Sequence, residues 1–272
     1  MNAFRNLLRT SGKTTPIGTW LMSGSPLVAE AVGHAGFDWG LIDMEHTPID
    51  MMEVVQLLQA VGNTKMVPVV RVPWNDAVTV KRVLDAGAKT VLFPFVQNAE
   101  EARRAVTSTR YPPQGTRGMS TMSRAAQFGT DGDYLTTANR GIAVIVQLET
   151  AQALAQAELI AAVDGVDALF IGPADLAASM GHPGQMLHPA VVEAMAQAAA
   201  RIKAAGKPVG ALGATPEAVV TYRAMGFDFM AIMSDMGLLM QGAKEAMRML
   251  RTGAREPQVH TLADGTQTEA AA

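Results

Sequence analysis

Polar residues with catalytic chemistry stand at or just after the ends of four short apolar runs in this sequence. In order along the chain they are Asp43, Glu45 and His46; Arg71; Gln147 and Glu149; and Asp175, which ends the turn of Gly172, Pro173, Ala174 and Asp175. If the apolar runs are parallel strands of a barrel, their carboxyl ends meet at one face, where barrel enzymes carry their chemistry. The sequence therefore predicts one dense polar cluster.

Glu149 and Asp175 are candidate metal ligands because they follow consecutive apolar runs and would be neighbours on the rim of a barrel. Two carboxylates without cysteine suit a hard divalent ion that keeps several waters. Mg²⁺ or Mn²⁺ fits best, with other divalent ions such as Co²⁺ as further candidates. Alternatively, each carboxylate only caps the alanine-rich helix that follows it. Both interpretations stay open here.

The turn at residues 172–175 leads from a strand into a helix, where backbone N–H groups can hold a carboxylate or a phosphate. An ordinary tight turn is the alternative. Arg71 ends an otherwise apolar run, so its buried charge needs an anion or an oxygen partner. That partner could be a bound anion or a salt bridge to Asp43 or Glu45, and the two are compatible.

His46 is the one histidine near a predicted strand end on the catalytic face, where a base that titrates near neutrality is expected. A single histidine is also commonly structural or solvated, so only its position singles it out. No lysine stands at a predicted carboxyl end, which disfavours Schiff-base chemistry. The absence of cysteine excludes thiolate zinc sites, iron–sulfur clusters and cysteine nucleophiles.

Eight apolar runs, each followed by a segment with helical periodicity, must position these residues. The runs are residues 17–21, 39–43, 66–71, 90–95, 142–149, 168–172, 208–212 and 229–234. The helical segments are residues 25–35, 49–61, 76–86, 99–109, 151–163, 189–205, 216–225 and 236–251. Nearly continuous apolar runs are typical of parallel strands buried on both faces. Without a dinucleotide-binding fingerprint, they predict an α/β protein with a closed (β/α)8 TIM barrel.

Length and composition fit this fold and exclude several classes of protein. The 272 residues suit one barrel domain, residues 1–252, followed by a polar C-terminal extension at residues 253–272. The connection at residues 110–141 is long enough to be functional or interfacial. A net charge of −3 without a basic stripe, and no long apolar run, predict no nucleic-acid partner, no membrane partner and a cytoplasmic location.

The candidate residues together suit the chemistry of a 2-oxo acid. Such an acid could chelate a divalent ion through its carboxylate and ketone oxygens, while Arg71 stabilises an enolate and His46 moves a proton. Longer stretches point the same way: FDW (37–39), LIDMEH (41–46), VVRVPWND (69–76), FVQNAEEA (95–102), RYPPQGTRG (110–118), VQLET (146–150) and FIGPADL (170–176). With these stretches, the chain up to about residue 250 resembles the class II, metal-dependent pyruvate aldolases, the family of the 4-hydroxy-2-oxoheptanedioate and 2-dehydro-3-deoxyglucarate aldolases.

The resemblance implies a (β/α)8 barrel that forms a homo-oligomer, a hexamer built as a trimer of domain-swapped dimers in which the last helix packs on a neighbouring barrel. It implies that Glu149 and Asp175 bind the metal and that Gln147 contacts the substrate. The turn at residues 172–175 would hold the pyruvate carboxylate through its backbone.

The resemblance also assigns the proton-transfer residues. Arg71 would stabilise the enolate and His46 would be the base, with an aspartate at the position of Asp85 raising the basicity of that histidine. Asp85 lies near the end of a predicted helix at the opposite end of its own barrel, so it would reach His46 only from an adjacent subunit. Asp43 is the nearer supporting residue within the same chain.

The implied reaction is the reversible cleavage of a 4-hydroxy-2-oxo acid, such as 4-hydroxy-2-oxoheptanedioate, to pyruvate and an aldehyde. Arg124 in the long connection could bind an acidic aldehyde such as succinic semialdehyde, or form an ion pair at a subunit interface. Two other functions stay open. An acyl-CoA lyase of the citramalyl- or malyl-CoA type would need a basic nucleotide-binding surface at the rim, which the sequence does not indicate. The chain could also be a non-catalytic barrel that binds 2-oxo acids.

Overall fold

The structure is a computed structural model that describes residues 2–10, 14–252, 259–261 and 267–269. The chain divides into two compact units, Met1–Asp235 and Met236–Ala272. The predicted domain boundary after residue 252 was drawn from composition, and it stays a prediction.

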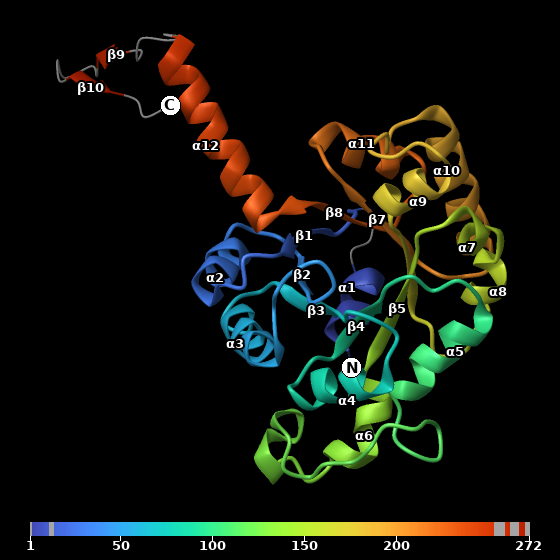
Figure 1. Ribbon diagram of the computed structural model, residues 1–272. Helices are drawn as coiled ribbons and strands as arrows, with labels where there is room; N and C mark the ends of the chain where they lie inside the picture. Colours follow the sequence, from blue (N-terminus) through green and yellow to red (C-terminus); the bar gives the residue numbers. More distant parts are fainter. Residues whose placement is uncertain (1, 11–13, 253–258, 262–266, 270–272) are drawn as a thin grey trace. The chain divides into compact units, whose positions relative to one another are not determined.

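Eight parallel strands of the first unit close into a barrel in sequence order, with β8 pairing back to β1 (Figure 1). They are β1 (Ile17–Leu21), β2 (Trp39–Asp43), β3 (Val67–Arg71), β4 (Thr90–Phe93), β5 (Ala143–Leu148), β6 (Ala168–Ile171), β7 (Val209–Gly213) and β8 (Phe229–Ser234). The predicted TIM barrel is confirmed. Each strand joins the next through a helical segment, so all eight carboxyl ends lie at one end of the barrel.

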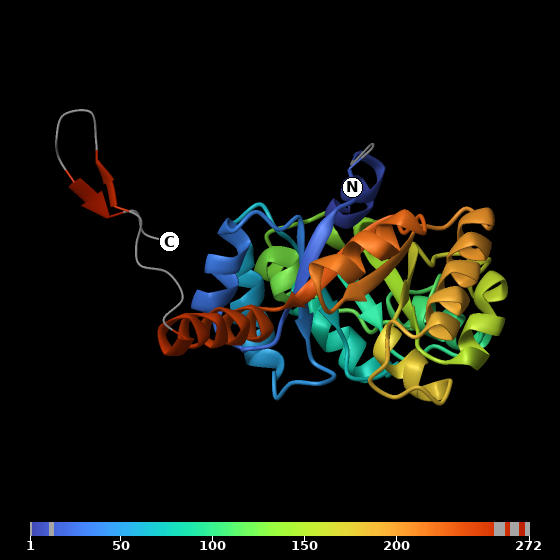
Figure 2. The same ribbon diagram turned by 90° about the horizontal axis from the view of Figure 1, so that it is seen from above.

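Helices surround the strands in both views of the barrel unit (Figures 1 and 2). They are α1 (Ala3–Thr10), α2 (Pro26–His34), α3 (Met51–Val61), α4 (Ala77–Asp85), α5 (Ala99–Ser108), η1 (Arg124–Gly129), α6 (Tyr134–Gly141), α7 (Ala151–Ala155), α8 (Ala157–Ala161), α9 (Pro173–Ser179), α10 (Pro189–Ala204) and α11 (Pro216–Ala224). Several begin at a side-chain cap: Ser25, Asp76, Asn98, Thr150 and Thr215 each accept the backbone N–H three residues later.

The structure differs from the predicted elements in the connections. The single helix expected at residues 151–163 is two short helices, α7 and α8, separated at Gln156, where φ is −98° and ψ is 7°. The long connection at residues 110–141 contains the 3-10 helix η1 and the helix α6. The helical period at residues 151–163 does not show the break at Gln156, and η1 and α6 are too short to give a long apolar period.

An aromatic cluster fills the barrel interior. Phe4 on α1 makes edge-on contacts with Trp39 and Phe229, at ring-centroid distances of 6.0 and 5.3 Å. Trp20 and Phe170 complete the cluster, with their ring centroids 5.5 Å apart. These side chains are nearly fully buried, and α1 therefore closes the amino end of the barrel with an apolar plug.

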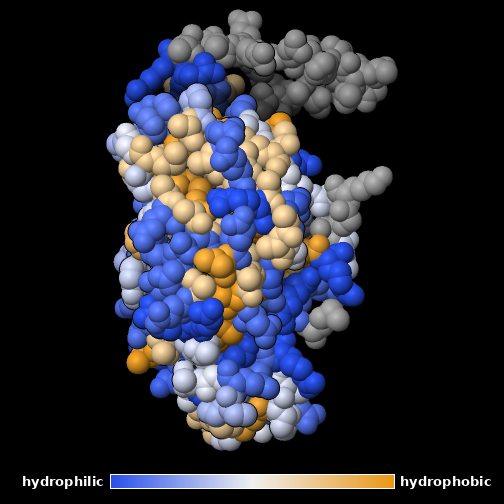
Figure 3. Space-filling model, turned by 90° about the vertical axis from the view of Figure 1, so that its right-hand side faces the viewer, coloured by the Kyte–Doolittle hydropathy of each residue, from blue (hydrophilic) through white to orange (hydrophobic). Residues whose placement is uncertain are grey.

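A second apolar layer lies between the strands and the outer helices. It includes Ile42, Val70, Val91, Val144 and Leu169, which face away from the barrel interior. Because both faces of each strand are buried, the strand sequences are continuously apolar. The outer surface mixes the two kinds of residue: the face in Figure 3 carries small apolar patches separated by hydrophilic side chains.

The second unit contains most of α12 (Asp235–Thr252) and two short strands, β9 (Val259–Thr261) and β10 (Gln267–Glu269), which pair antiparallel. The sequence shows no strand period in this polar extension, whose remaining residues lie outside the described residues. None of the helices in the described part of the chain is long and apolar enough to cross a membrane.

Close packing in the barrel interior predicts the effect of adding one methyl group at Gly18. A Cβ atom there would lie 2.3 Å from the Trp39 ring. We expect Gly18→Ala to lower the free energy of unfolding by about 1–3 kcal/mol, because overpacking forces Trp39 or the strand to move.

Gly132→Ala is the matched control, since nothing lies within 4 Å of a Cβ atom at Gly132. Urea denaturation of both variants measures the difference. Equal unfolding midpoints would contradict the tight contact between β1 and Trp39.

Candidate active site

The carboxyl end of the barrel gathers most of the predicted polar residues. Asp43 and Arg71 are the last residues of β2 and β3, and Gln147 is the second-last residue of β5. Glu149 follows β5 directly. Gly172 alone separates the end of β6 from α9 and is the N-cap of that helix, and Asp175 lies in the first turn of α9. The strand order alone brings these residues from distant sequence positions to one face.

Arg71 and Asp43 form a buried pair between neighbouring strands. They are partners in the parallel register of β2 and β3. Arg71 Nε and one terminal nitrogen donate to the two carboxylate oxygens of Asp43, at 2.8 and 2.7 Å. The other terminal nitrogen lies 2.8 Å from Oε2 of Glu45. The predicted salt bridge to Asp43 or Glu45 is therefore present to both.

Charges from these two acids determine the electrostatics of the arginine. Burial alone lowers the pKa of Arg71, but the hydrogen bond and the charge of Asp43 outweigh burial and raise it. The guanidinium carbon also lies 5.6 Å from the centre of the Trp20 ring. Arg71 is thus a fixed positive charge at the inner end of the site.

Glu149 is almost fully buried, and both of its oxygens have hydrogen-bond donors. Oε2 accepts the backbone N–H of Phe95 at 3.0 Å, and Oε1 accepts Nε2 of Gln147. Burial, together with the negative charges of Glu45 and Asp175, raises the pKa of Glu149 to about 7. Desolvation likewise raises the pKa of Glu45. The site therefore concentrates more negative charge than its own residues neutralise.

Gly172 keeps the space beside Glu149 open. A Cβ atom at Gly172 would lie 2.8 Å from both Gln147 Nε2 and Glu149 Oε1. Gly172 is also the N-cap of α9, and Pro173 is the first residue of that helix. The segment Gly172, Pro173, Ala174 and Asp175 is therefore the turn from β6 into α9. The proposed role of Ala174 and Asp175 in holding a carboxylate stays a prediction.

These groups fit a hard divalent cation. Oε1 of Gln147 is buried without a hydrogen-bond partner, and burial and the charge of Asp175 raise the pKa values of both Glu45 and Glu149. A cation would neutralise that charge through oxygen ligands. Among the residues that the structure describes, no group of three His, Cys, Asp or Glu side chains could hold a metal ion. Water or substrate would therefore complete the ligands of such a cation.

His46 lies at the outer edge of this site. Its side chain is 58% exposed, and its Nε2 atom lies 3.8 Å from Oε2 of Glu45. The carboxylate of Asp43 accepts hydrogen bonds from Arg71 and from the backbone N–H of Glu45, and its predicted support of His46 stays a prediction. The guanidinium binds Asp43 because the register places the two side by side.

Asp85 and Arg124 lie at the amino end of the barrel in this chain. Asp85 ends α4 and accepts a hydrogen bond of 2.6 Å from the buried Arg117. Arg124 donates to the carbonyl oxygen of Ala86 at 2.8 Å. The structure therefore does not bring Asp85 to His46 within one chain, and it leaves Arg124 at the opposite end of the barrel from the carboxyl-end cluster. The roles of both residues stay predictions.

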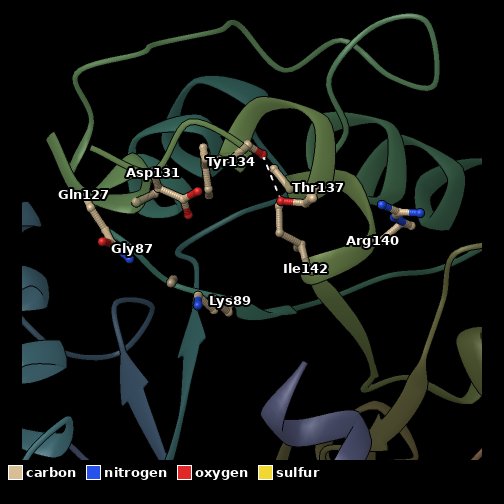
Figure 4. A pocket seen from close by; sticks show the side chains of 12 residues that line it. Gly87, Lys89, Gln127, Asp131, Tyr134, Thr137, Arg140 and Ile142 are labelled. Atoms are coloured by element: carbon tan, nitrogen blue, oxygen red, sulfur yellow. Dashed lines mark hydrogen bonds between the residues drawn. The ribbon is translucent and has the colours of Figure 1, made fainter. Parts of the chain in front are cut away.

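A cavity of about 440 Å³ lies at this amino end, between the long connection and the starts of β4 and β5. Figure 4 shows Lys89, Asp131, Tyr134 and Arg140 around it, with the Thr137 hydroxyl donating to the Tyr134 carbonyl oxygen. None of the residues predicted to be catalytic lines it. The carboxyl-end cluster, and not this cavity, is therefore the candidate active site.

Two contacts of the site could not be found from residue types. The Phe95 amide binds Glu149, and Trp20 lies against Arg71. A sequence does not indicate which backbone N–H donates to a side chain, and Trp20 is one apolar residue within an apolar strand. Only the spatial arrangement identifies them.

Comparison with known proteins gives consistent similarities. A sequence model of the HpcH/HpaI aldolase/citrate lyase family matches residues 16–242. A 2-dehydro-3,6-dideoxy-6-sulfogluconate aldolase from Pseudomonas putida is 48% identical over 239 residues, 88% of this chain and 94% of the relative. A pyruvate aldolase from Rhizobium etli is 47% identical over 246 residues, 90% of this chain and 95% of the relative.

The fold is also similar to that of a solved structure. The crystal structure of a HpcH/HpaI aldolase/citrate lyase family protein from Burkholderia cenocepacia superimposes with a TM-score of 0.88 at 44% sequence identity. The match covers 92% of this chain and 100% of the other.

The buried ion pair predicts a large effect of Asp43→Asn on stability. This change leaves the Arg71 guanidinium buried with Glu45 as its one charged partner on β2 and the loop after it. We expect the free energy of unfolding to fall by about 3 kcal/mol, as for other buried pairs that lose one partner.

The control for Asp43→Asn is Glu158→Gln, which breaks the exposed pair with Arg201. Its effect should stay below about 0.5 kcal/mol. Denaturant titration of the two variants gives both values, and similar losses would contradict a special role for Asp43.

The raised pKa of Glu149 predicts a pH-dependent stability of the metal-free protein. The folded protein keeps a proton up to about pH 7 that the unfolded chain loses near the ordinary pKa of 4.5. Stability therefore falls as the pH rises from about 5 to 8, by up to about 3 kcal/mol. Glu149→Gln cannot ionise, so it should flatten this fall and exceed the wild type in stability at pH 8.

Denaturation in EDTA at several pH values measures this dependence. Thr137→Val at the opposite end of the barrel should keep the wild-type pH dependence. Parallel curves for the wild type and Glu149→Gln would show that Glu149 is not the group that titrates.

Proposed function

The chain belongs to the HpcH/HpaI aldolase/citrate lyase family, and on that premise we propose that it is a divalent-metal-dependent aldolase that reversibly cleaves a 4-hydroxy-2-oxo acid to pyruvate and an aldehyde. One observation carries the proposal. The Arg71 guanidinium, held by Asp43 and Glu45, lies at the same barrel end as the carboxylates of Glu149 and Asp175, whose negative charge Arg71 only partly compensates. This arrangement suits a reaction in which negative charge develops on an oxygen beside a cation.

Glu149 and Asp175 would hold the cation, with Mg²⁺ or Mn²⁺ as the first candidates and Co²⁺ as another. Their oxygen atoms, and the cluster's excess of negative charge, support this assignment. When bound, the cation supplies positive charge that polarises the 2-oxo group of the substrate. Gln147 would contact that part of the substrate, since its Oε1 atom is buried and without a hydrogen-bond partner.

Arg71 and His46 would then divide the proton and charge transfers. His46 accepts the proton of the C4 hydroxyl through a water molecule, and its exposure and its neighbour Glu45 support this role. The C3–C4 bond breaks, the aldehyde leaves, and the electron pair passes to the 2-oxo oxygen near Arg71. A proton delivered to C3 completes pyruvate. The turn at residues 172–175 would orient the substrate carboxylate.

The aldehyde side of the site would involve a second copy of the chain. Asp85 and Arg124 lie at the amino end of their own barrel, so an adjacent subunit would have to supply them to His46 and to an acidic aldehyde. We propose a homo-oligomer, a hexamer formed as a trimer of dimers with exchanged C-terminal helices. Exposed apolar side chains on α12, among them Leu239 and Leu250, support such an exchange. Light scattering of the intact protein measures the subunit number.

Proton exchange into pyruvate tests the proposed half-reaction without any choice of aldehyde. Metal-loaded protein in D₂O should remove the methyl signal of pyruvate in proton NMR, and EDTA treatment should prevent this. We expect Arg71→Ala to slow the exchange by about 10²–10³-fold, because it removes charge that stabilises the developing oxyanion.

Arg104→Ala is the control, since the Arg104 side chain is exposed and lies on the outer helix α5. Its exchange rate should equal that of the wild type. A folded, metal-loaded protein that leaves the methyl signal intact would remove the aldolase proposal and favour an acyl-CoA lyase or a binding protein. An unchanged rate in Arg71→Ala would remove only the assigned role of Arg71.

A further inference from the structure

Phe95 has a backbone conformation that phenylalanine rarely adopts. Its φ angle is 55°, in the left-handed region where a Cβ atom is crowded by the backbone. The residue stands two positions after β4, in the connection to α5 at the carboxyl end of the barrel. Strained conformations of this kind persist only where surrounding contacts hold them, and they gather at functional sites.

The contacts of this connection show what the conformation achieves. The Phe95 N–H donates to Oε2 of Glu149 at 3.0 Å, and the next N–H, of Val96, donates to the carbonyl oxygen of Gln147 at 3.0 Å. One residue further, Gln97 accepts the Thr150 hydroxyl at 2.6 Å. Three consecutive residues thus hold the end of β5. Gln147, the candidate substrate contact, and Glu149, the candidate cation ligand, lie there.

The side chain of Phe95 has a different surrounding from its amide. Its ring stacks on Trp74 with a centroid distance of 6.0 Å and an interplanar angle of 28°. Both residues are exposed, Phe95 to 40% and Trp74 to 57%. The amide is therefore the part of Phe95 that meets a buried group, while the ring stays at the surface.

We propose that Phe95 is a positioning residue whose left-handed backbone fixes the Glu149 carboxylate and thereby sets the affinity of the site for a divalent cation. The inference rests on the proposed function, because it takes Glu149 as a cation ligand. The Phe95 amide holds Oε2 and the Gln147 side chain meets Oε1, so the carboxylate cannot rotate. Hydrogen bonds of this kind to a metal ligand change metal affinity by about 10–100-fold.

Substitutions at Phe95 can separate the backbone from the ring. Glycine adopts the left-handed conformation without strain and asparagine tolerates it, so both keep the amide in place although they lack the ring. Valine and threonine are branched at Cβ and disfavour this conformation most strongly. They should turn the amide away from Glu149.

Binding of Mn²⁺ to the metal-free, full-length protein measures the effect, with free Mn²⁺ counted by electron paramagnetic resonance. We expect Phe95→Gly and Phe95→Asn to bind within about threefold of the wild type, and Phe95→Val at least about tenfold more weakly. Phe95→Thr is a second β-branched variant in case Phe95→Val does not fold, and circular dichroism establishes the fold of each.

Phe128→Val is the matched control. Phe128 is also an exposed phenylalanine with a left-handed backbone, at a φ of 56°, but it lines a cavity at the amino end of the barrel. The same substitution there should leave Mn²⁺ affinity unchanged. A loss equal to that of Phe95→Val would overturn the inference, since strain anywhere in the fold would then weaken the site.

The remaining outcomes separate this inference from the proposed function. Equal Mn²⁺ affinity in the wild type and in the folded β-branched variants overturns the role of Phe95 and leaves the cation site intact. A loss in Phe95→Gly as large as in Phe95→Val also overturns it, because the ring would then be the active part. If the wild type binds no Mn²⁺, or Glu149→Gln binds it equally well, both proposals fail.

Discussion

The buried contact between Arg71 and Asp43 is the interaction on which the carboxyl end of this barrel depends. Arg71 is only 5% exposed, so its guanidinium is stable only beside acceptors, and the parallel register places Asp43 at the same level of the neighbouring strand. The two-point contact also fixes the direction of the third nitrogen, toward Glu45. The positive charge of the site therefore has one position before any ligand arrives.

Burial, together with an excess of carboxylates around the Arg71 guanidinium, explains the raised pKa of Glu149. Glu149 is buried near Glu45 and Asp175, and Arg71 compensates only part of their combined charge, so the pKa of Glu149 rises to about 7. Gly172 keeps the adjacent space free of a side chain. A cation at this place would remove the repulsion and ionise Glu149, which links metal binding to proton release.

The two ends of the barrel differ in chemistry because different segments of the chain form them. The carboxyl end collects the strand-terminal residues, whereas the amino end holds the long connection, with Asp85 bound to the buried Arg117 and Arg124 bound to Ala86. A single chain thus separates His46 from Asp85, which the family resemblance assigns to it, and from Arg124, a candidate for binding an acidic aldehyde. Assembly of several chains is the arrangement that would bring Asp85 and Arg124 of one chain close to His46 of another.

The sequence by itself determined the barrel and its reactive face. Strands β1, β2 and β8 have the predicted bounds, because residues buried on both faces of a strand form continuous apolar runs. Only the tertiary structure decided the partners: Arg71 with both Asp43 and Glu45, and the Phe95 amide on Glu149. The strand order follows from local periodicity along the chain. The contacts depend on register, side-chain direction and the path of each loop through space, which no local pattern encodes.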